Sequence, residues 1–512
     1  METFSTHSEL ALDDAVDALG TAEFAFGDGH RSALTVLDSF DGRLHAAGLR
    51  LELHDGRHRE LVLRGPAGSP PVHITWTGKA PASAEDLPGG PFGARIAAVI
   101  GERALMPVFD VASVRREAVR RDRRGKPIVT VAVHDDVTVQ STTTGQPLRV
   151  IEVSTSLGSE PAVRHAVEPL VALGLTPARG DLVDAVLAIT GASLDGYHRD
   201  PSAPLRRDDD AFDAFRIVLR NLLASAVDNL PGTLDDLDPE FLHDFRVALR
   251  RTRSVLGEGK SVLPHDVRDR FRTGFAELSA ATSAARDLDV YVLAWPDTIA
   301  ALGLDDPTVV DPLHDELLAR RSQARAQLAK VLRSRAVKTL LESWRSWLDD
   351  DEVRPPYDAP RPIGPHVAAR IAKAQSGLLR DGRSITADCP AERLHDLRKD
   401  AKRLRYLFEC FGAVLPGKAR REFVGQLKGL QDNLGLHQDA EVQTAELRAL
   451  AHDLHARSAI GPDALLAVGR IIDHLERTRR GERDAFAKHF AAYDTADNRE
   501  LLAGLLAKAA NA

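Results

Sequence analysis

The chain has 512 residues, of which 43% are hydrophobic and 28% are charged, and its formal net charge is −8. This composition is typical of a soluble globular protein with roughly two to four domains, and no stretch approaches the ~18 consecutive apolar residues of a membrane-spanning helix. The negative net charge excludes an overall field that would attract nucleic acid or anionic lipid, so any anion-binding site must be a local basic patch.

The first ten residues, METFSTHSEL, contain no basic segment followed by an apolar run, so no signal peptide is predicted. The two cysteines, Cys389 and Cys410, are too few for a disulfide framework or a four-ligand zinc site. We therefore expect two free thiols in a soluble, cytoplasmic protein.

Short runs with strand-like patterns dominate residues 1–200. Turn signals such as Gly65-Pro66 and Asp122–Gly125 separate these runs, and two segments near the end of the region have a helical pattern. The fold class predicted is therefore α+β, beginning with an antiparallel β domain of tunnel or barrel type over residues 1–200. The strands are expected at 33–37, 49–53, 60–63, 73–77, 128–133, 137–140 and 149–155, and the helices at 160–174 and 180–190.

Residues 204–508 have the apolar periodicity of helices, which begins after a charged, proline-containing stretch at 198–210. A proline-rich connector at 354–365 divides this region into halves, 204–352 and 364–508. Four helices are expected on each side of the connector, which predicts an all-α domain of two four-helix bundles. The expected helices are 211–229, 239–257, 264–296, 308–349, 366–381, 391–413, 417–456 and 461–492.

A basic motif occurs twice in the helical region, with an offset of 152 residues. The first copy runs from His243 to Arg253 and the second from His395 to Arg405. The same offset pairs Leu278 with Leu430, Asp287 with Asp439 and Val290 with Val442. A register that is kept from residue 243 to residue 290 indicates a duplicated structural unit.

Each copy of the motif places cations on one stripe of a helix. At about 100° per residue, positions 243, 246, 250 and 253 fall within an arc of roughly 80°, as do positions 395, 398, 402 and 405. Leucines and phenylalanines occupy the adjoining face, where they would pack into the core. Like charges on one helix face repel by a few tenths of a kcal/mol per pair, so the stripe requires partners.

The partners of these cations could be acidic residues of the chain, such as Asp287 and Asp439, or an external polyanion. We favour the polyanion because the motif is duplicated and few acidic residues interrupt it. Arginine suits phosphate because its planar fork donates two parallel hydrogen bonds. The candidate ligand-binding residues are His243, Arg246, Arg250, Arg251, Arg253, His395, Arg398, Lys399, Lys402, Arg403 and Arg405.

Nucleic acid is the competing polyanion. Single-stranded nucleic acid requires exposed aromatic side chains on which bases stack, whereas only 5% of the chain is aromatic and the basic motifs offer mainly Tyr406. No helix-turn-helix, zinc-finger or RNP pattern is visible. A ligand made of phosphates without bases fits the sequence better.

The two motifs resemble the signature of the CHAD domain, the conserved histidine α-helical domain. The resemblance covers about residues 204–508 and includes Arg286–Val290 after the first motif and His437–Val442 after the second. It implies two four-helix bundles related by pseudo-twofold symmetry, with a basic surface that binds inorganic polyphosphate. It also implies association with polyphosphate granules, and no known catalysis.

Residues 1–200 resemble a CYTH domain, the triphosphate tunnel fold, which often precedes a CHAD domain. The resemblance rests on a turn that contains Asp38, on Arg115-Arg116 followed by residues 128–139, and on a strand that contains Glu152. However, the Glu-x-Glu-x-Lys strand of active members is absent. Val62 replaces an expected lysine, and Ser154 replaces the second carboxylate of the late acidic strand.

Metal-assisted phosphoryl chemistry requires several oxygen ligands around Mg²⁺ or Mn²⁺, and too few remain here. We therefore expect no enzymatic activity, no metal and no cofactor. The alternative is a metal-dependent triphosphatase or polyphosphatase with a rearranged site that uses Mg²⁺ or Mn²⁺. Its surviving tunnel residues would be Arg115, Arg116 and Glu152, although each could equally be an exposed strand residue.

The sequence therefore predicts a non-catalytic protein whose partner is inorganic polyphosphate, in the cytoplasm and in association with polyphosphate granules. No membrane partner is expected. The metal-dependent hydrolase is the first alternative, and a nucleic-acid-binding protein is the second.

Overall fold

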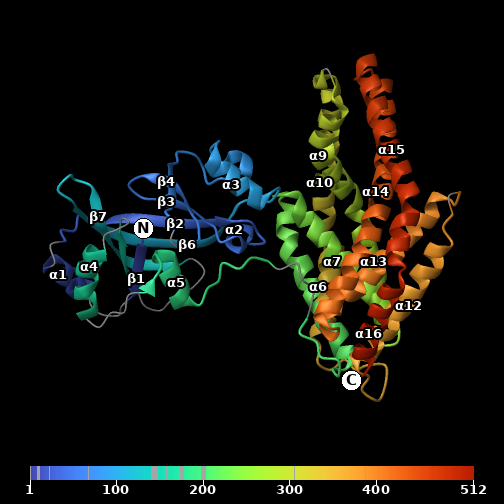
Figure 1. Cartoon of the computed structure of the whole chain (residues 1–512), viewed down its shortest axis with the longest axis horizontal. Helices are drawn as coiled ribbons and strands as arrows, with labels where there is room; N and C mark the ends of the chain where they lie inside the picture. Colours follow the sequence, from blue (N-terminus) through green and yellow to red (C-terminus); the bar gives the residue numbers. More distant parts are fainter. Residues whose placement is uncertain are drawn as a thin grey trace. The chain divides into compact units, whose positions relative to one another are not determined.

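The computed structural model of the chain describes residues 2–7, 12–21, 24–66, 69–139, 148–155, 160–172, 178–197, 203–304, 306–386 and 388–511. The chain divides into two compact units, Met1–His198 and Arg199–Ala512 (Figure 1). The first unit is built on an antiparallel sheet and the second is helical, which confirms the predicted α+β class.

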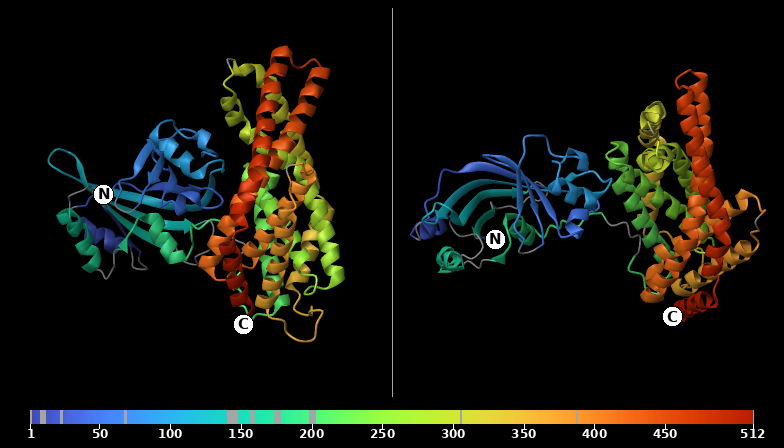
Figure 2. Two further views of the ribbon diagram at one scale, coloured as in Figure 1. Left: turned by 45° about the vertical axis from the view of Figure 1, so that its right-hand side comes forward. Right: turned by 45° about the horizontal axis from the view of Figure 1, so that its top comes forward.

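The β unit contains one nine-stranded sheet in the order β5-β4-β3-β2-β6-β7-β8-β1-β9, with antiparallel pairing throughout. The sheet is strongly curved (Figure 2). Its strands are β1 (Glu2–His7), β2 (His30–Asp38), β3 (Arg50–Asp55), β4 (Arg59–Arg64), β5 (Val72–Thr75), β6 (Met106–Arg121), β7 (Pro127–Val139), β8 (Leu148–Thr155) and β9 (Ala178–Arg179).

Several features of the sheet differ from the prediction, which also lacked strands β1 and β9. The long central strand β6 was missed because its arginine and glutamate side chains obscure the alternation of apolar residues that marks a strand. Conversely, the predicted strands 128–133 and 137–140 are one strand, β7. The pair Asp135-Asp136 resembles a turn but forms a bulge, where the pairing with β8 shifts between His134 and Val137 and Asp136 has a φ of 48°.

The two faces of the sheet have different coverings. On the outer face, α3 (Pro91–Ile100) packs against β3 and β4, while α1 (Leu12–Thr21) and α4 (Glu160–Ala172) cover β6 to β8. The short helix α5 (Leu182–Thr190) packs against apolar residues of the inner face. The inner face also carries charged side chains, among them Glu52, Glu117 and Glu152.

The described part of the second unit forms eleven α-helices. The sequence offset is visible in their bounds, because α7 and α13 begin 152 residues apart and end 152 residues apart. The proline-rich stretch 354–362 lies between α11 and α12. The helices are α6 (Ala211–Leu234), α7 (Pro239–Glu258), α8 (His265–Ala281), α9 (Ser283–Leu302), α10 (Asp311–Leu332), α11 (Arg335–Asp349), α12 (Ile363–Arg383), α13 (Ala391–Cys410), α14 (Gly417–Ala456), α15 (Pro462–Tyr493) and α16 (Ala496–Ala510).

Two of the long helices predicted for the first half are interrupted. The helix expected at 264–296 breaks at Thr282, where the hydroxyl groups of Ser279 and Thr282 donate to backbone carbonyls of the preceding turn. The helix expected at 308–349 breaks at Ser334, which caps α11. The structure also adds α16, which follows the last predicted helix.

The two halves of the helical unit share one hydrophobic core. The largest cluster of buried side chains draws on α6 to α11 of the first half and on α12 to α16 of the second. Phe215 of α6 contacts Phe411, just after α13, with ring centroids 4.8 Å apart. A second cluster joins the far ends of α9, α10, α14 and α15, which extend beyond the other helices (Figure 1).

Because the core is shared, Phe215→Ala should destabilise both halves together, by about 3–5 kcal/mol for a buried phenylalanine. Chemical denaturation followed by far-UV circular dichroism should show one earlier transition for the whole helical unit. The control is Leu466→Ala, since the Leu466 side chain is 70% exposed and should change little. Two separate unfolding transitions within the helical signal, only one of them shifted by the substitution, would contradict a shared core.

Candidate functional site

Two reciprocal ion pairs join the duplicated helices α7 and α13. Arg251 of α7 donates to Glu409 of α13, with Nε and Oε2 2.9 Å apart. At the equivalent position of the second repeat, Arg403 donates from Nε to Glu258 of α7. Arg251 precedes Glu258 on α7, whereas its partner Glu409 follows Arg403 on α13. The two helices therefore cross antiparallel, about a pseudo-twofold axis.

These pairs assign Arg251 and Arg403 a role within the protein. Both were predicted to bind a ligand, but each neutralises a carboxylate of the other repeat. Glu258 is only 2% exposed and also accepts a hydrogen bond from Arg370 of α12 at 2.5 Å. The two arginines therefore hold the repeats together, although Arg403 also lines the groove described next.

A groove of about 860 Å³ lies between α7, α8 and α13. Cations from both repeats converge on it, and its only two carboxylates among the described residues are Glu258, which is already paired twice, and Glu277. The antiparallel crossing of the helices is what brings the two cationic stripes to one groove. The seven cationic lining residues are Arg250, Arg253, Arg272, Arg398, Lys399, Lys402 and Arg403.

Several hydrogen-bond donors of this groove are not used within the described residues. The Nε atoms of Arg250 and Arg398 are buried and have no hydrogen-bond partner there, although Arg398 also donates from Nη2 to Asp439 at 3.2 Å. Buried donors without partners are costly. An anion in the groove would supply acceptors for them.

The protonation of Lys402 depends on its burial and on its neighbours. Its burial, together with the positive charges of Arg398 and Arg250, lowers the pKa of Lys402 to about 7, and the nearby Asp439 offsets this only in part. Without an anion, the Lys402 amine is therefore only partly protonated at neutral pH. A bound anion would favour the protonated form.

Arg246 occupies a different environment from its counterpart Arg398. Its guanidinium donates to the backbone carbonyl of Ser279 and to the hydroxyl groups of Thr282 and Ser283, at the break between α8 and α9. Burial and the charge of Arg250 lower the pKa of Arg246 to about 10. Arg246 thus stabilises the helix break and does not line the groove.

The remaining predicted residues have mixed environments on α7 and α13. His395 forms a hydrogen bond between Nδ1 and Oε1 of Gln438 at 2.6 Å, and His243 is half-buried on α7. Neither histidine is among the described residues that line the groove.

Lys399 lies on the groove and pairs with Asp396 at 3.0 Å. Arg405 pairs with Glu409 at 3.1 Å, beside the ring of Tyr406.

Arg272 of α8 is a groove residue that sequence reasoning missed. It lies outside the duplicated motif, and the residue 152 positions later is Val424, so the repeat contains no signal for it. Only the packing of α8 beside α7 brings Arg272 to the groove.

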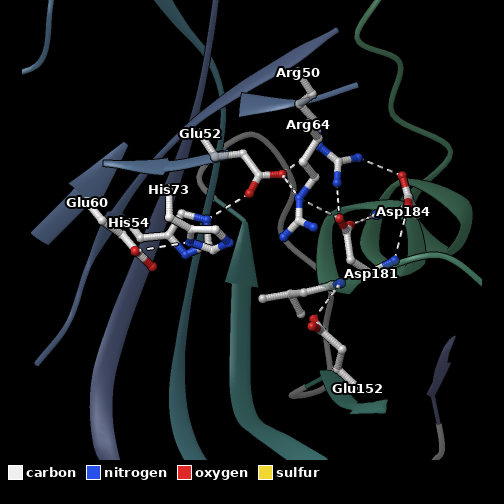
Figure 3. Close-up of polar contacts among 10 residues, drawn as sticks. Arg50, Glu52, His54, Glu60, Arg64, His73, Glu152, Asp181 and Asp184 are labelled. Atoms are coloured by element: carbon white, nitrogen blue, oxygen red, sulfur yellow. Dashed lines mark hydrogen bonds and ion pairs between the residues drawn. The ribbon is translucent and has the colours of Figure 1, made fainter. Parts of the chain in front are cut away.

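The inner face of the β unit holds a second charged cluster (Figure 3). Glu52 of β3 is fully buried and accepts hydrogen bonds from Nε of Arg50 at 2.6 Å and from Nε of Arg64 at 2.8 Å. His54 contacts its other oxygen at 2.7 Å. Although burial opposes it, the hydrogen bond from His54 and the charges of Arg64 and Arg50 hold the pKa of Glu52 well below its usual range.

The same arginines tie α5 to the sheet. Asp181, the N-cap of α5, forms ion pairs with Arg50 and with Arg64, the latter at 2.9 Å. Glu152 of β8 accepts a hydrogen bond from the backbone N–H of Leu182 at 3.1 Å. Three carboxylates of the inner face are therefore neutralised by arginines or by the first turn of α5 (Figure 3).

The residues expected as remnants of a tunnel site are divided between the two faces of the sheet. Arg115 pairs with Glu117 at 2.9 Å and lines a pocket of about 420 Å³ on the inner face, where Glu152 also lies. Arg116 follows on the opposite face and pairs with Asp135 at 3.0 Å. Arg115 and Arg116 therefore lie on opposite faces of the sheet.

Three carboxylates of the inner face already have partners within the protein. Glu52, Glu152 and Asp181 accept from arginines or backbone N–H groups. Among the described residues, no group of three or more His, Cys, Asp or Glu is arranged to hold a metal ion.

No helix in the described ranges has the length and apolar character that a bilayer crossing requires.

The chain is similar to several proteins of known structure. No curated protein sequence matches the chain. One similar solved structure is the CHAD domain from the plant Ricinus communis, which is 24% identical to this chain with a TM-score of 0.45. The match covers 59% of this chain and 93% of that domain. PptA from Streptomyces chartreusis is 17% identical with a TM-score of 0.43, over 55% of this chain and 100% of its own.

A putative adenylyl cyclase from Hippeastrum, described as having a dominant triphosphatase activity, is 16% identical with a TM-score of 0.27. It covers 38% of this chain and 100% of its own length. The family model of the CHAD domain matches residues 217–448, from α6 to α14. The helical unit of this protein therefore contains a CHAD domain.

Proposed function

We propose that the protein binds inorganic polyphosphate in the groove between α7, α8 and α13 and does not cleave it. The observation that carries the proposal is the charge of this groove, where seven cations face two carboxylates and one of these, Glu258, is already paired twice. A flexible chain of phosphates would bring one negative charge to each successive cation.

Phosphate without bases fits the groove better than nucleic acid does. Arginine forks such as those of Arg250 and Arg253 suit phosphate oxygens. The only aromatic side chain among the described lining residues is Tyr406, which is 5% exposed and so presents no face on which a base could stack. Polyphosphate is also the ligand that the CHAD resemblance implies.

Reversing the charge of three groove cations should abolish binding. In Arg250→Glu/Arg253→Glu/Lys402→Glu, each lost charge-assisted contact costs about 1.5–3 kcal/mol, so affinity for polyphosphate should fall more than about a hundredfold. Fluorescence anisotropy with labelled polyphosphate measures this, and circular dichroism checks the fold. The reversals leave Arg251 and Arg403 in place, so the repeats remain joined.

The matched control is Arg333→Glu/Arg335→Glu/Lys338→Glu, which makes the same change in net charge at exposed positions outside the groove. The control should bind nearly as well as the wild type. Equal affinity in the groove variant and the wild type would remove the groove as the site.

Binding should weaken as the pH rises above neutrality. Since the pKa of Lys402 is about 7 and a bound anion favours its protonated form, the free protein takes up a proton on binding above pH 7. Affinity should therefore be greatest below pH 7 and fall by up to about tenfold per pH unit above it. Lys402→Arg keeps its charge and should bind with little pH dependence between pH 7 and 9; an unchanged profile would exclude Lys402 as the cause.

The metal-dependent hydrolase remains the alternative. We expect no phosphate release from triphosphate, ATP or polyphosphate with Mg²⁺ or Mn²⁺, because Glu52 and Asp181 are engaged by Arg50 and Arg64. A phosphate-release assay on the full chain tests this. Hydrolysis that disappears in Glu152→Gln but persists in the groove variant would establish the alternative.

Cytoplasmic location and association with polyphosphate granules remain predictions, which imaging of the tagged protein would test.

A further inference from the structure

A basic hairpin on the β unit is not used by the proposed groove. It consists of residues 120–126, where β6 turns into β7, and Asp122 is its only acidic residue. The pairing of β2 with β6 ends at Arg115, and that of β8 with β7 begins at Val129, so the hairpin extends past both neighbouring strands. It is the teal loop that extends from the sheet in the left view of Figure 2. Its five cations are Arg120, Arg121, Arg123, Arg124 and Lys126.

The turn of this hairpin is ordered by its single acid. Asp122 Oδ1 accepts the backbone N–H groups of Arg124 and Lys126, both at 2.8 Å, and Arg121 Nη1 donates to the carbonyl of Gly125 at 3.0 Å. Gly125 has a φ of +80°, which suits glycine at this position. The carboxylate of Asp122 is thus committed to the backbone and does not pair with a cationic side chain.

The cations of the basic hairpin face solvent. Arg121, Arg123, Arg124 and Lys126 are exposed and Arg120 is half-buried. Within the described part of the chain, none of the five forms an ion pair. Since a protein of net charge −8 has no general excess of cations, five cations within seven residues form a local positive patch that an external anion would neutralise.

We propose that the basic hairpin is a second contact for a chain of phosphates, separate from the CHAD groove. The choice of ligand rests on the proposed function. The hairpin residues 120–126 contain no aromatic side chain for base stacking and no large apolar side chain for insertion into a membrane. Arginine and lysine alone recognise phosphate charge, which is the chemistry that inorganic polyphosphate presents along its length.

A second contact has a distinct consequence for chain length. A phosphate chain that only fills the groove gains nothing from the hairpin, whereas a chain long enough to reach both contacts could engage them at once. Once the groove holds one part of a long chain, the rest is present at high effective concentration for the hairpin. The hairpin should therefore raise the affinity for long chains selectively.

The test compares the full-length wild type with the hairpin variant Arg120→Ser/Arg123→Ser/Arg124→Ser/Lys126→Ser. Arg121 and Asp122 stay, so the turn keeps its hydrogen bonds. Binding of short-chain and long-chain polyphosphate is measured over a series of salt concentrations. Short-chain affinity should not change. Long-chain affinity should fall at least about tenfold, and its slope against salt on logarithmic axes should decrease by roughly 3, since each phosphate contact contributes about 0.7–0.9.

The matched control removes four cations elsewhere, in Arg333→Ser/Arg335→Ser/Lys338→Ser/Arg345→Ser, and should behave as the wild type does. If the hairpin variant also keeps the long-chain affinity and salt slope of the wild type, the hairpin contact is wrong and the groove proposal stands. If the wild type binds neither chain, the proposed function itself fails. If the hairpin variant loses more affinity for single-stranded DNA than for long-chain polyphosphate, the assigned phosphate chain is wrong.

Discussion

The crossing of α7 and α13 is the constraint on which the candidate site depends. Arg251 with Glu409 and Arg403 with Glu258 are partly buried pairs, so loss of one partner would leave the other charge without its compensation. They fix the two helices antiparallel. Because the motif is duplicated, this crossing turns two separate basic stripes into two walls of a single groove.

The β unit uses the same pair of chemical groups with the opposite result. On its inner face, Arg50 and Arg64 meet Glu52 and Asp181, and the charges cancel within the protein. In the groove of the helical unit, arginines outnumber the available carboxylates and several donors stay unused. The ratio of cations to acids, rather than the number of arginines, distinguishes a surface suited to an external anion from an interior that is held closed.

The helical repeat and its basic stripes could be predicted because they follow from a constant offset and from the period of the helix. The role of each cation could not. Arg251 and Arg253 belong to the same motif, yet one pairs with Glu409 and the other faces the groove, and only the crossing of the helices decides between them. Arg272 was missed because only tertiary packing brings it to the groove. Strand β6 was missed because charged residues mask its apolar alternation.

The shared core of the helical unit has a consequence for its covalent continuity. Side chains from both repeats interdigitate around Phe215 and Phe411, so neither repeat by itself presents a complete apolar interior. In the peptide link at 354–362, the Tyr357 ring packs against that interior and its hydroxyl donates to Asp210 at the N-cap of α6. A chain cut within this link should therefore behave as two complementary fragments, each incompletely folded alone, that regain the native helical unit only when they associate.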